Sequence, residues 1–277
     1  MRASIIVPVY NAGSYLSRTL PRWLEQSGVG DYEVVLVDNN SSDGGMRGLP
    51  AHPRLRTLSQ PVQGAYRARN AGVAAARGEA LVFTDPDCLA EPTWLAALIA
   101  PLVDPAVEIV MGRDRHAGEG RSIRMLSAYD HVKESWTMSQ PDGTLYYGHT
   151  NNMAVDRACW DAVGPFETAP RGADVVFVRR AVERFGPGAV VYRPEALVHH
   201  LEVDTAVKYF RKCRIYGQSY RRYRRVVATR ALGWSQRWRV YRMTVDRERL
   251  GPLRAAWLLA LLVVGVGHYT WGRWVDR

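Results

Sequence analysis

The sequence is poor in cysteine, and this scarcity argues against several classes of protein. Its 277 residues include three cysteines, at positions 88, 159 and 213, an odd number without the spacing of a metal site. We therefore expect no disulfide framework, and a reducing compartment is the simplest setting. The chain also lacks a long apolar run in its opening stretch, MRASIIVPVYNAG. A run of about five residues is too short for the core of a signal peptide, so we interpret it as a strand of the fold.

Acidic residues are scarce in one region, between Thr205 and Arg254. This segment has fifteen Lys or Arg and two acids and carries a net charge of +13, whereas the whole chain carries +10. The basic character is therefore local, and the rest of the chain is close to neutral. Nucleic-acid binding is one interpretation of such a segment. Its tyrosines favour packing or a membrane interface instead, and we expect no nucleic-acid partner, because one helical face would carry Tyr209, Tyr216, Tyr220 and Tyr223.

The first 110 residues alternate between short β-branched runs and helical patterns, as βαβ units do. Strands are predicted at Ala3–Val9, Glu33–Val37, Leu55–Ser59 and Ala80–Thr84. Helices are predicted at Ser14–Gln26, at Tyr66–Ala76 and from Pro92 to Leu102. The carboxyl ends of parallel strands form the edge where ligands bind in such sheets. Polar residues gather at these ends, in the stretches Tyr10-Asn11, Asp38-Asn39-Asn40 and Asp85-Pro86-Asp87.

The pattern is weaker beyond Val107. We predict an extended segment at Leu145–Val155, a short helix at Arg157–Val163, a helix at Asp174–Phe185 and a strand at Ala189–Arg193. A basic helix follows from Asp204 to Ala228, and a wholly apolar stretch runs from Ala255 to Gly267.

Two acids, Asp85 and Asp87, lie at the end of an apolar strand with one proline between them. Neighbouring carboxylates make each other harder to ionise, so such a pair needs a reason. A divalent cation bridging the acids to diphosphate oxygens would remove the repulsion. A surface turn is the alternative, because Pro and Asp are common in turns.

Four segments follow one another in a recognisable order: SIIVPVYNAGSYL, EVVLVDNNSSDG, GAYRARNAGVAAARGEALVFTDPDC and GADVVFVRR. Together they resemble the motifs of family 2 glycosyltransferases, over residues 3–200. The resemblance implies the α/β GT-A fold, a Rossmann-like, mostly parallel sheet flanked by helices, and inverting transfer from a nucleotide sugar. We expect a catalytic domain over residues 1–203, with a nucleotide-sugar half (1–110) and an acceptor-side half (111–203). A basic helical segment and an apolar membrane-associating tail would follow over residues 204–277.

The resemblance also implies roles for individual residues. Asp38 matches the acid that hydrogen-bonds the nucleotide base, by family default the uracil of a UDP-sugar, and Tyr10 would stack on that base. The residues implied to bind the donor are Pro8, Tyr10, Asn11, Asp38, Arg69, Asn70 and Asp85. Asp87 in the Asp-x-Asp (DXD) motif is the implied direct ligand of Mn²⁺ or Mg²⁺. Asp85 lies nearer the ribose or a metal-bound water, and His200 is a candidate third ligand, with a structural histidine as the alternative.

Asp174 matches the family's catalytic base, which takes the proton of the attacking acceptor hydroxyl. The family has an acid directly before this Asp, whereas this chain has Ala173. The alternative is that Asp174 only caps the following helix. Asn151 and Asn152 match the strand beside the acceptor, although their amides could equally satisfy backbone groups in a turn.

The apolar stretch Ala255–Gly267 lies within eighteen residues without charge, the lower limit for a membrane span. Its aromatic flanks and basic neighbours favour peripheral attachment to an anionic membrane from the cytoplasmic side. A spanning helix and a helix packed on the catalytic domain are the alternatives. A lipid-linked acceptor glycan would fit such a tail.

Three other functions are alternatives to the transfer of a single sugar. A processive polymerase would carry Q-x-x-R-W, whereas the chain has Gln218-Ser219-Tyr220-Arg221-Arg222. A dinucleotide oxidoreductase would carry G-x-G-x-x-G after the first strand, where this chain has Tyr10-Asn11. A relative that binds nucleotide or sugar without turnover stays open, supported by Ala173 alone.

Overall fold

The computed structural model describes residues 2–168 and 171–275, and these form two compact units. Unit 1 comprises the described residues up to Arg113 together with Tyr147–His199. Unit 2 comprises Asp114–Tyr146 together with the described residues from His200 onward. This division differs from the boundary expected after residue 203, because residues 114–146 form a compact unit with the C-terminal segment.

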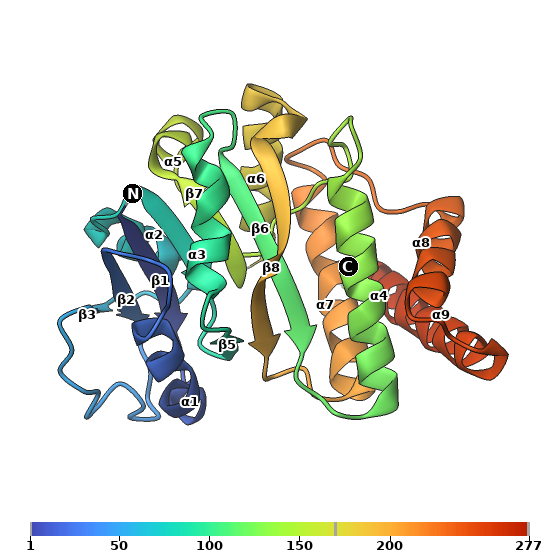
Figure 1. Cartoon of the computed structure of the whole chain (residues 1–277), viewed down its shortest axis with the longest axis horizontal. Coiled ribbons are helices and arrows are strands. Elements are labelled where there is room, and N and C mark those ends of the chain that lie inside the picture. The colour runs from blue at the N-terminus through green and yellow to red at the C-terminus, as the bar shows by residue number, and fades with distance from the viewer. Residues whose placement is uncertain (1, 169–170, 276–277) are drawn as a thin grey trace. The chain divides into compact units, whose positions relative to one another are not determined.

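The sheet begins with four parallel strands, β1 (Ala3–Val9), β2 (Tyr32–Asp38), β3 (Leu55–Ser59) and β4 (Ala80–Thr84). The other strands are β5 (Cys88–Ala90), β6 (Ile109–His116), β7 (Asn152–Asp156) and β8 (Val190–His200). Over the described residues the strand order is β3-β2-β1-β4-β7-β6-β8-β5, and β7 is antiparallel to β4 and β6 (Figure 1). The crossover at β1 brings the carboxyl ends of β1, β2 and β4 to one edge.

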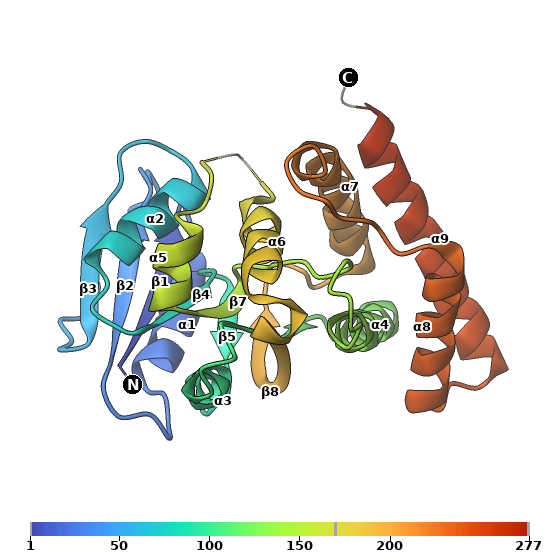
Figure 2. The same ribbon diagram turned by 90° about the horizontal axis from the view of Figure 1, so that it is seen from above.

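Helices cover both faces of this sheet. α1 (Gly13–Leu24) and α3 (Trp94–Ile99, continued by the 3-10 turn η1, Ala100–Val103) lie on one face. α2 (Ala65–Ala75), α5 (Arg157–Val163) and α6 (Ala173–Phe185) lie on the other, as Figure 2 shows. A short 3-10 turn, η2 (Pro187–Ala189), leads into β8. The sheet is thus buried from both sides, which explains why its strands read as unbroken apolar runs.

Periodicity explains why α1 forms where it does. Leu16, Leu20 and Trp23 recur at helical spacing and are all buried. They pack against the alternate side chains of β1 that point to the same face, among them Ile5 and Val7. The apolar positions that predicted a helix and a strand therefore meet in one core.

The predicted elements of unit 1 are largely confirmed. The strands at Ala3–Val9, Leu55–Ser59 and Ala80–Thr84 and the helix at Arg157–Val163 have the expected bounds. The extended segment predicted at Leu145–Val155 is wrong over its first half, because the strand β7 begins at Asn152. β8 continues to His200, well past the predicted Arg193. Neither β6 nor the helix that follows it was predicted.

Unit 2 contains the helices α4 (Arg121–Met138), α7 (Ala206–Tyr223), α8 (Trp234–Arg247) and α9 (Pro252–Val275). Side chains of α4, such as Tyr129 and Trp136, form a buried cluster with Val240 of α8 and Leu258 of α9. This cluster is the physical reason why α4 belongs with the C-terminal helices.

α7 and α9 approach each other closely at glycines. A Cβ atom added to Gly217 would lie 2.1 Å from the carbonyl oxygen of Tyr269, and one added to Gly272 would lie 2.0 Å from that of Arg214. Only glycine permits such backbone contact. Among the described helices, α9 is long and apolar enough to cross a membrane, with a mean hydropathy of 1.4 and 17% of that stretch buried. This property follows from the length and the apolar composition of α9 alone.

Candidate active site

The loops after β1 and β2 are tied together. Asn11 has a left-handed backbone (φ 48°), and its side-chain oxygen accepts the N–H groups of Ser42 at 2.8 Å and Asp43 at 3.2 Å. Asp38, at the end of β2, accepts the N–H of Ser41 at 3.0 Å. Tyr10 lies beside this junction with 52% of its surface exposed. The junction therefore holds an exposed aromatic ring next to a partly buried carboxylate.

Two residues predicted to bind the nucleotide-sugar donor, Pro8 and Asn11, lie at this junction. Pro8 is buried within β1, next to Val37 of β2. Asn11 uses its side chain for the loop contacts just described. Asp43 accepts the N–H of Gly13, the first residue of α1, at 2.8 Å, and backbone hydrogen bonds of this kind lower its pKa. The loop acid therefore holds the start of a helix.

Asn39 has a role that sequence reasoning missed. It is buried, its NH₂ group donates to the carbonyls of Gln60 and Val62, and its oxygen accepts the N–H of Gly64 at 2.7 Å. Gly64 precedes α2, so this amide fixes the path of the chain into that helix. Its position at the end of a strand indicated a role for Asn39. The sequence alone does not distinguish a structural amide from one that binds a ligand.

Asp85, Pro86 and Asp87 form a turn after β4, which we call the acid turn. The N–H of Cys88 donates to the carbonyl of Asp85 at 3.0 Å, and the hydroxyl of Thr19 in α1 donates to the carbonyl of Pro86 at 2.9 Å. Asp87 is buried, with 8% of its surface exposed. A turn does occur here, but one of its acids lies inside the protein, which the surface-turn alternative does not explain.

Arg69 of α2 reaches the acid turn. It is 4% exposed, and its guanidinium group forms an ion pair with the carboxylate of Asp85. Its neighbour Asn70 faces elsewhere, because its amide exchanges hydrogen bonds with the backbone of Phe166 at 2.8 and 3.1 Å. Asn70 thus fixes α2 against the segment before α6, and its predicted donor contact stays a prediction.

Asp174 lies in the first turn of α6. One carboxylate oxygen accepts the N–H of Val175 at 2.9 Å, and the other lies 3.4 Å from the N–H of Thr150. The residue at the N-cap is Gly172, and no side chain among the described residues caps the helix there. The hydroxyl of Tyr66 in α2 accepts the N–H of Gly172, two residues earlier, at 3.3 Å. Asp174 is therefore not the N-cap, and it faces side chains from another helix.

The surroundings of Asp174 act on its pKa in both directions. Burial raises the pKa of this carboxyl above its usual value and is the largest effect. The neighbouring Tyr66 hydroxyl and the positive charge of Arg69 lower the pKa in part, as does the nearby His149. A carboxylate with a raised pKa is suited to accept a proton.

The predicted acceptor residues behave differently from one another. Asn152 is buried, accepts a hydrogen bond from the Trp94 indole at 2.8 Å, and donates to the carbonyls of Arg113 and Ala196. These bonds connect β7 with the helix α3 and with the strands β6 and β8. Asn151 is partly buried, and its oxygen lies 3.0 Å from Nδ1 of His149. The stretch stays tight against α6, because a Cβ atom on Gly148 would lie 2.6 Å from the carbonyl oxygen of Asp174.

His200 is the last residue of β8 and is buried. Its Nε2 lies 2.9 Å from Nζ of Lys212 in α7.

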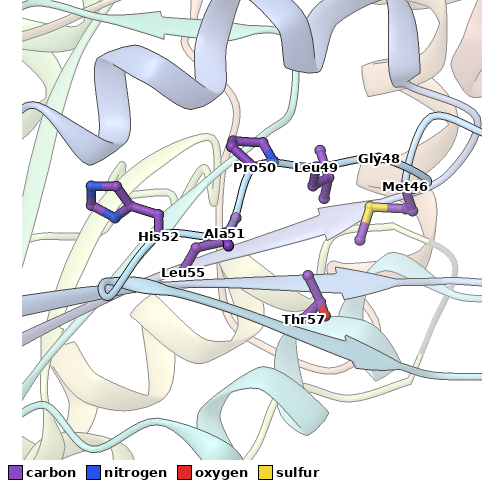
Figure 3. A pocket seen from close by; sticks show the side chains of 8 residues that line it. All are labelled: Met46, Gly48, Leu49, Pro50, Ala51, His52, Leu55 and Thr57. Carbon is purple, nitrogen blue, oxygen red and sulfur yellow. The ribbon is translucent and has the colours of Figure 1, made fainter.

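A pocket of about 320 Å³ lies away from these residues, under the loop between β2 and β3 (Figure 3). It is lined by Met46, Gly48, Leu49, Pro50, Ala51, His52, Leu55 and Thr57. None of the predicted site residues lines it, so we do not connect it with the acid turn.

Comparison with known proteins gives this geometry a context. The model of the family described as glycosyl transferase family 2 matches residues 4–163. The chain is 28% identical over 189 residues to the glycosyltransferase AglE of Haloferax volcanii, covering 65% of this chain and 61% of that protein. It is 28% identical over 207 residues to the pre-mycofactocin glycosyltransferase of Mycobacterium tuberculosis, covering 71% of this chain and 42% of that protein. The match therefore spans less than two thirds of either relative.

Solved structures share the fold. A mannosyltransferase from Pyrobaculum calidifontis, in complex with GDP-Man and Mn²⁺, superposes with a TM-score of 0.66 at 20% identity, covering 100% of this chain and 88% of that one. Glucosyl-3-phosphoglycerate synthase from Mycobacterium tuberculosis, in complex with Mn²⁺, UDP-glucose and phosphoglyceric acid, gives 0.52 at 17% identity, covering 80% and 79%. At these identities the likeness establishes the fold, which is the GT-A arrangement expected from the motifs.

Proposed function

The chain belongs to glycosyl transferase family 2, and from this premise we propose that it moves one sugar, with inversion, from a nucleotide-diphosphate sugar to an acceptor hydroxyl. The observation that carries the proposal is the position of Arg69. This arginine pairs with Asp85 of the acid turn, and its charge also acts on Asp174. The acid turn and the candidate base are thus linked to the same guanidinium group, which supports one site for both.

The donor is proposed to bind along the carboxyl ends of β1, β2 and β4. Tyr10 would stack on the base, and Asp38 would accept a hydrogen bond from it. Uracil is the base we propose, although the related folds carry guanosine as well as uridine donors. Arg69 suits the donor phosphates, because a guanidinium group is a permanent cation with forked donors.

The residues of the acid turn fit a divalent metal. Carboxylate oxygens are the ligands that Mg²⁺ and Mn²⁺ prefer, and the buried Asp87 gains most from a nearby cation. We propose Asp87 as a direct ligand, Asp85 beside it, and His200 as the third ligand. When bound, the metal supplies positive charge that stabilises the diphosphate leaving group.

Asp174 is the proposed base. As the acceptor oxygen bonds to the anomeric carbon, its proton passes to the Asp174 carboxylate. The bond from that carbon to the diphosphate oxygen breaks, and its electron pair leaves with the nucleotide. Attack from the face opposite the leaving group inverts the anomeric centre, and no covalent enzyme intermediate forms. Asn151 is proposed to contact the acceptor, whereas Asn152 supports the strand beneath it.

We also propose that unit 2 rests on the cytoplasmic surface of an anionic membrane and does not cross it. The exposed face of α9 carries Val263 and Trp274, which suits the interfacial region. Its opposite face packs on α7 at the glycines described above, and α7 carries Arg214, Arg221 and Arg222. Carrying α9 through a bilayer would place these charges in hydrocarbon, which is costly. A lipid-linked glycan is the acceptor class that fits this location.

A relative that binds nucleotide without turnover is the second candidate. Its support is Ala173, a buried alanine where the family has an acid. The two candidates differ in whether Asp174 matters for turnover.

The first experiment is a thermal-shift panel with UDP, GDP, CDP, dTDP and NAD, each with Mn²⁺ or with EDTA. A ligand at 100 times its Kd stabilises the folded state by about 2.7 kcal/mol, a shift of several degrees. A Mn²⁺-dependent shift with one diphosphate supports the donor site and identifies its base. The absence of a shift with every nucleotide, in folded protein, contradicts the proposal.

A further inference from the structure

α8 has a packed side and an exposed side. Val240 and Thr244 on the packed side are fully buried, and Val240 belongs to the cluster that joins α8 to α4 and α9. The hydroxyl of Tyr241 donates to the carbonyl of Ala255 in α9 at 3.1 Å, and Figure 2 shows the two helices side by side. These contacts fix which side of α8 faces the solvent.

Two tryptophans lie on the exposed side of α8. Trp234 is 77% exposed and Trp238 is 52% exposed, and their spacing of four residues makes them neighbours on the helix surface. The ring of Trp238 packs on that of Tyr241, with the centroids 5.0 Å apart. An exposed pair of large apolar rings is informative, because such rings favour burial. Tryptophan has an apolar body and one N–H donor, which suits the boundary between water and lipid.

Arginines complete the exposed side. Arg242 continues the row of the two tryptophans at the same spacing, and Arg239 and Met243 form the adjacent row, all of them exposed. Within the described residues, neither Arg239 nor Arg242 takes part in an ion pair. The whole helix has four arginines and one acid, Asp246. This side of α8 therefore combines aromatic rings with positive charge that no acid of the fold neutralises.

We propose that this side of α8 binds lipid and lies in the headgroup region of an anionic bilayer. We call it the α8 surface and define it by Trp234, Trp238, Arg239, Arg242 and Met243. The inference rests on the proposed attachment of unit 2 to a membrane and adds a second contact to it. The indoles enter the interfacial region, and the guanidinium groups bind lipid phosphates and carboxylates, whose paired oxygens match their forked donors.

The length of α8 is that of a helix on a membrane surface. Its 14 residues extend over about 21 Å at 1.5 Å per residue, whereas a span needs about 20 residues. Tryptophan beside arginine is typical of helices that lie in the plane of the interface. α9 has no Lys, Arg, Asp or Glu between Arg254 and Arg273. The α8 surface thus supplies the charge that selects anionic lipid, and the exposed face of α9 supplies apolar contact.

Two observations favour lipid over a protein or a nucleic acid as the partner. α8 packs on α9, which is long and apolar enough to cross a membrane. The α8 surface is therefore continuous with the helix most suited to lipid. In addition, the Trp238 ring is already packed on Tyr241, so it is a poorer platform for a stacked base.

The charge of the α8 surface is tested with the double variant Arg239→Gln, Arg242→Gln in the full chain. Binding is measured by sedimentation with vesicles of phosphatidylcholine, alone or with an equal part of phosphatidylserine. A basic residue near an anionic surface contributes about fivefold to binding, so we expect about 25-fold weaker binding to the anionic vesicles. Arg18→Gln, Arg22→Gln is the matched control, because both arginines are exposed on α1 in unit 1. We expect this control to bind like wild type.

The aromatic part of the α8 surface is tested with Trp234→Phe, Trp238→Phe. Vesicles with brominated acyl chains quench the emission of indoles that enter the bilayer. Equal quenching of the nine tryptophans of the chain would assign two ninths of the quenched emission to this pair. We expect the double variant to lose more than that share, because both indoles lie at the interface. A smaller loss contradicts their insertion.

The outcomes separate the α8 surface from the membrane location on which it rests. Wild-type protein that binds neither kind of vesicle contradicts the location, and the α8 surface with it. If Val263→Ser, Trp274→Ser weakens binding while both α8 variants match wild type, the α8 surface is wrong and attachment through α9 stands. Equal losses in the two arginine double variants show an effect of net charge alone and also overturn the α8 surface.

A second copy of the chain is the remaining occupant to test. Gel filtration without lipid compares wild type with Trp234→Ser, Trp238→Ser. We expect the two proteins to elute alike. A wild-type dimer that becomes a monomer in this variant would assign the surface to a protein contact and overturn its assignment to lipid.

Discussion

The guanidinium group of Arg69 is paired with the carboxylate of Asp85, sixteen residues further along the chain. Arg69 is almost fully buried, whereas the Asp85 side chain is 30% exposed. A buried cation thus has its counter-charge at the edge of the acid turn, where the donor phosphates are proposed to bind. Breaking such a pair leaves a buried group without its partner, which costs more than the pair itself contributes.

We therefore predict that Arg69→Lys weakens nucleotide binding although it keeps the charge, because lysine lacks the forked donors. The expected loss of UDP affinity in the presence of Mn²⁺ is about tenfold or more, the value of one or two charge-assisted hydrogen bonds. Isothermal titration calorimetry measures it. Arg56→Lys is the control, since Arg56 pairs with Glu33 at 2.9 Å in the same unit, away from the acid turn. Equal losses in both variants would count against the role of Arg69.

Asp174→Asn should keep nucleotide binding and lose about 10²–10⁴ in transfer rate, the usual contribution of a general base. In wild-type protein the rate should fall as the pH drops through the Asp174 pKa, because the protonated acid accepts no proton. Burial raises this pKa, so the fall should begin at a higher pH than for an exposed Asp. A pH–rate profile of kcat/KM measures it, and a rate that is flat down to pH 4 would contradict it.

The same raised pKa affects stability in the opposite direction. The folded state holds the proton of Asp174 more tightly than the unfolded state, so its stability falls as the pH rises past the ordinary pKa of Asp. The loss is complete once the pH exceeds the raised pKa. We predict that Asp174→Asn is at least as resistant to urea as wild type at pH 7, and that the difference narrows at pH 4. A variant that is much less stable at pH 7 would argue against the raised pKa.

Asp87→Asn should abolish the Mn²⁺ dependence of nucleotide binding, because a neutral amide is a weaker ligand for a hard divalent cation. The thermal-shift panel measures this with UDP, with and without EDTA. Asp104→Asn serves as the control, since Asp104 only accepts the N–H of Ala106 at an exposed turn. An undiminished Mn²⁺ effect in Asp87→Asn would remove this residue from the proposed metal site.

Membrane attachment is best tested on the exposed face of α9, because deleting the helix would uncover α7. The double variant Val263→Ser, Trp274→Ser changes two side chains that are 62% and 67% exposed. We predict that less of the double variant than of wild type sediments with phosphatidylserine vesicles. Both proteins should bind little to phosphatidylcholine vesicles. Val103→Ser, 77% exposed in unit 1, is the matched control. Equal binding of all three proteins would contradict the proposed surface.

The sequence predicted the strands and the polar residues at their ends because local pattern determines both. It did not predict α4, because this helix is buried on most of its circumference and carries polar residues such as His131 and Glu134 inside. An amphipathic stripe is absent from such a helix. The structural roles of Asn70 and Asn152 could not be predicted either, because the backbone groups that their amides bond come from distant segments. The contact of Tyr66 with Gly172, 106 residues away, required the folded chain.

Thr19 gives the acid turn a property that matters before any ligand arrives. Its buried hydroxyl lies within hydrogen-bonding distance of two carbonyls, that of Tyr15 in its own helix and that of Pro86 in the turn. The turn is thus hydrogen-bonded to α1 and adopts its conformation before a ligand binds. Ordering a loose loop on binding costs free energy that subtracts from affinity. Here that entropy has been given up during folding, so the affinity of the turn for its ligand depends on charge and fit.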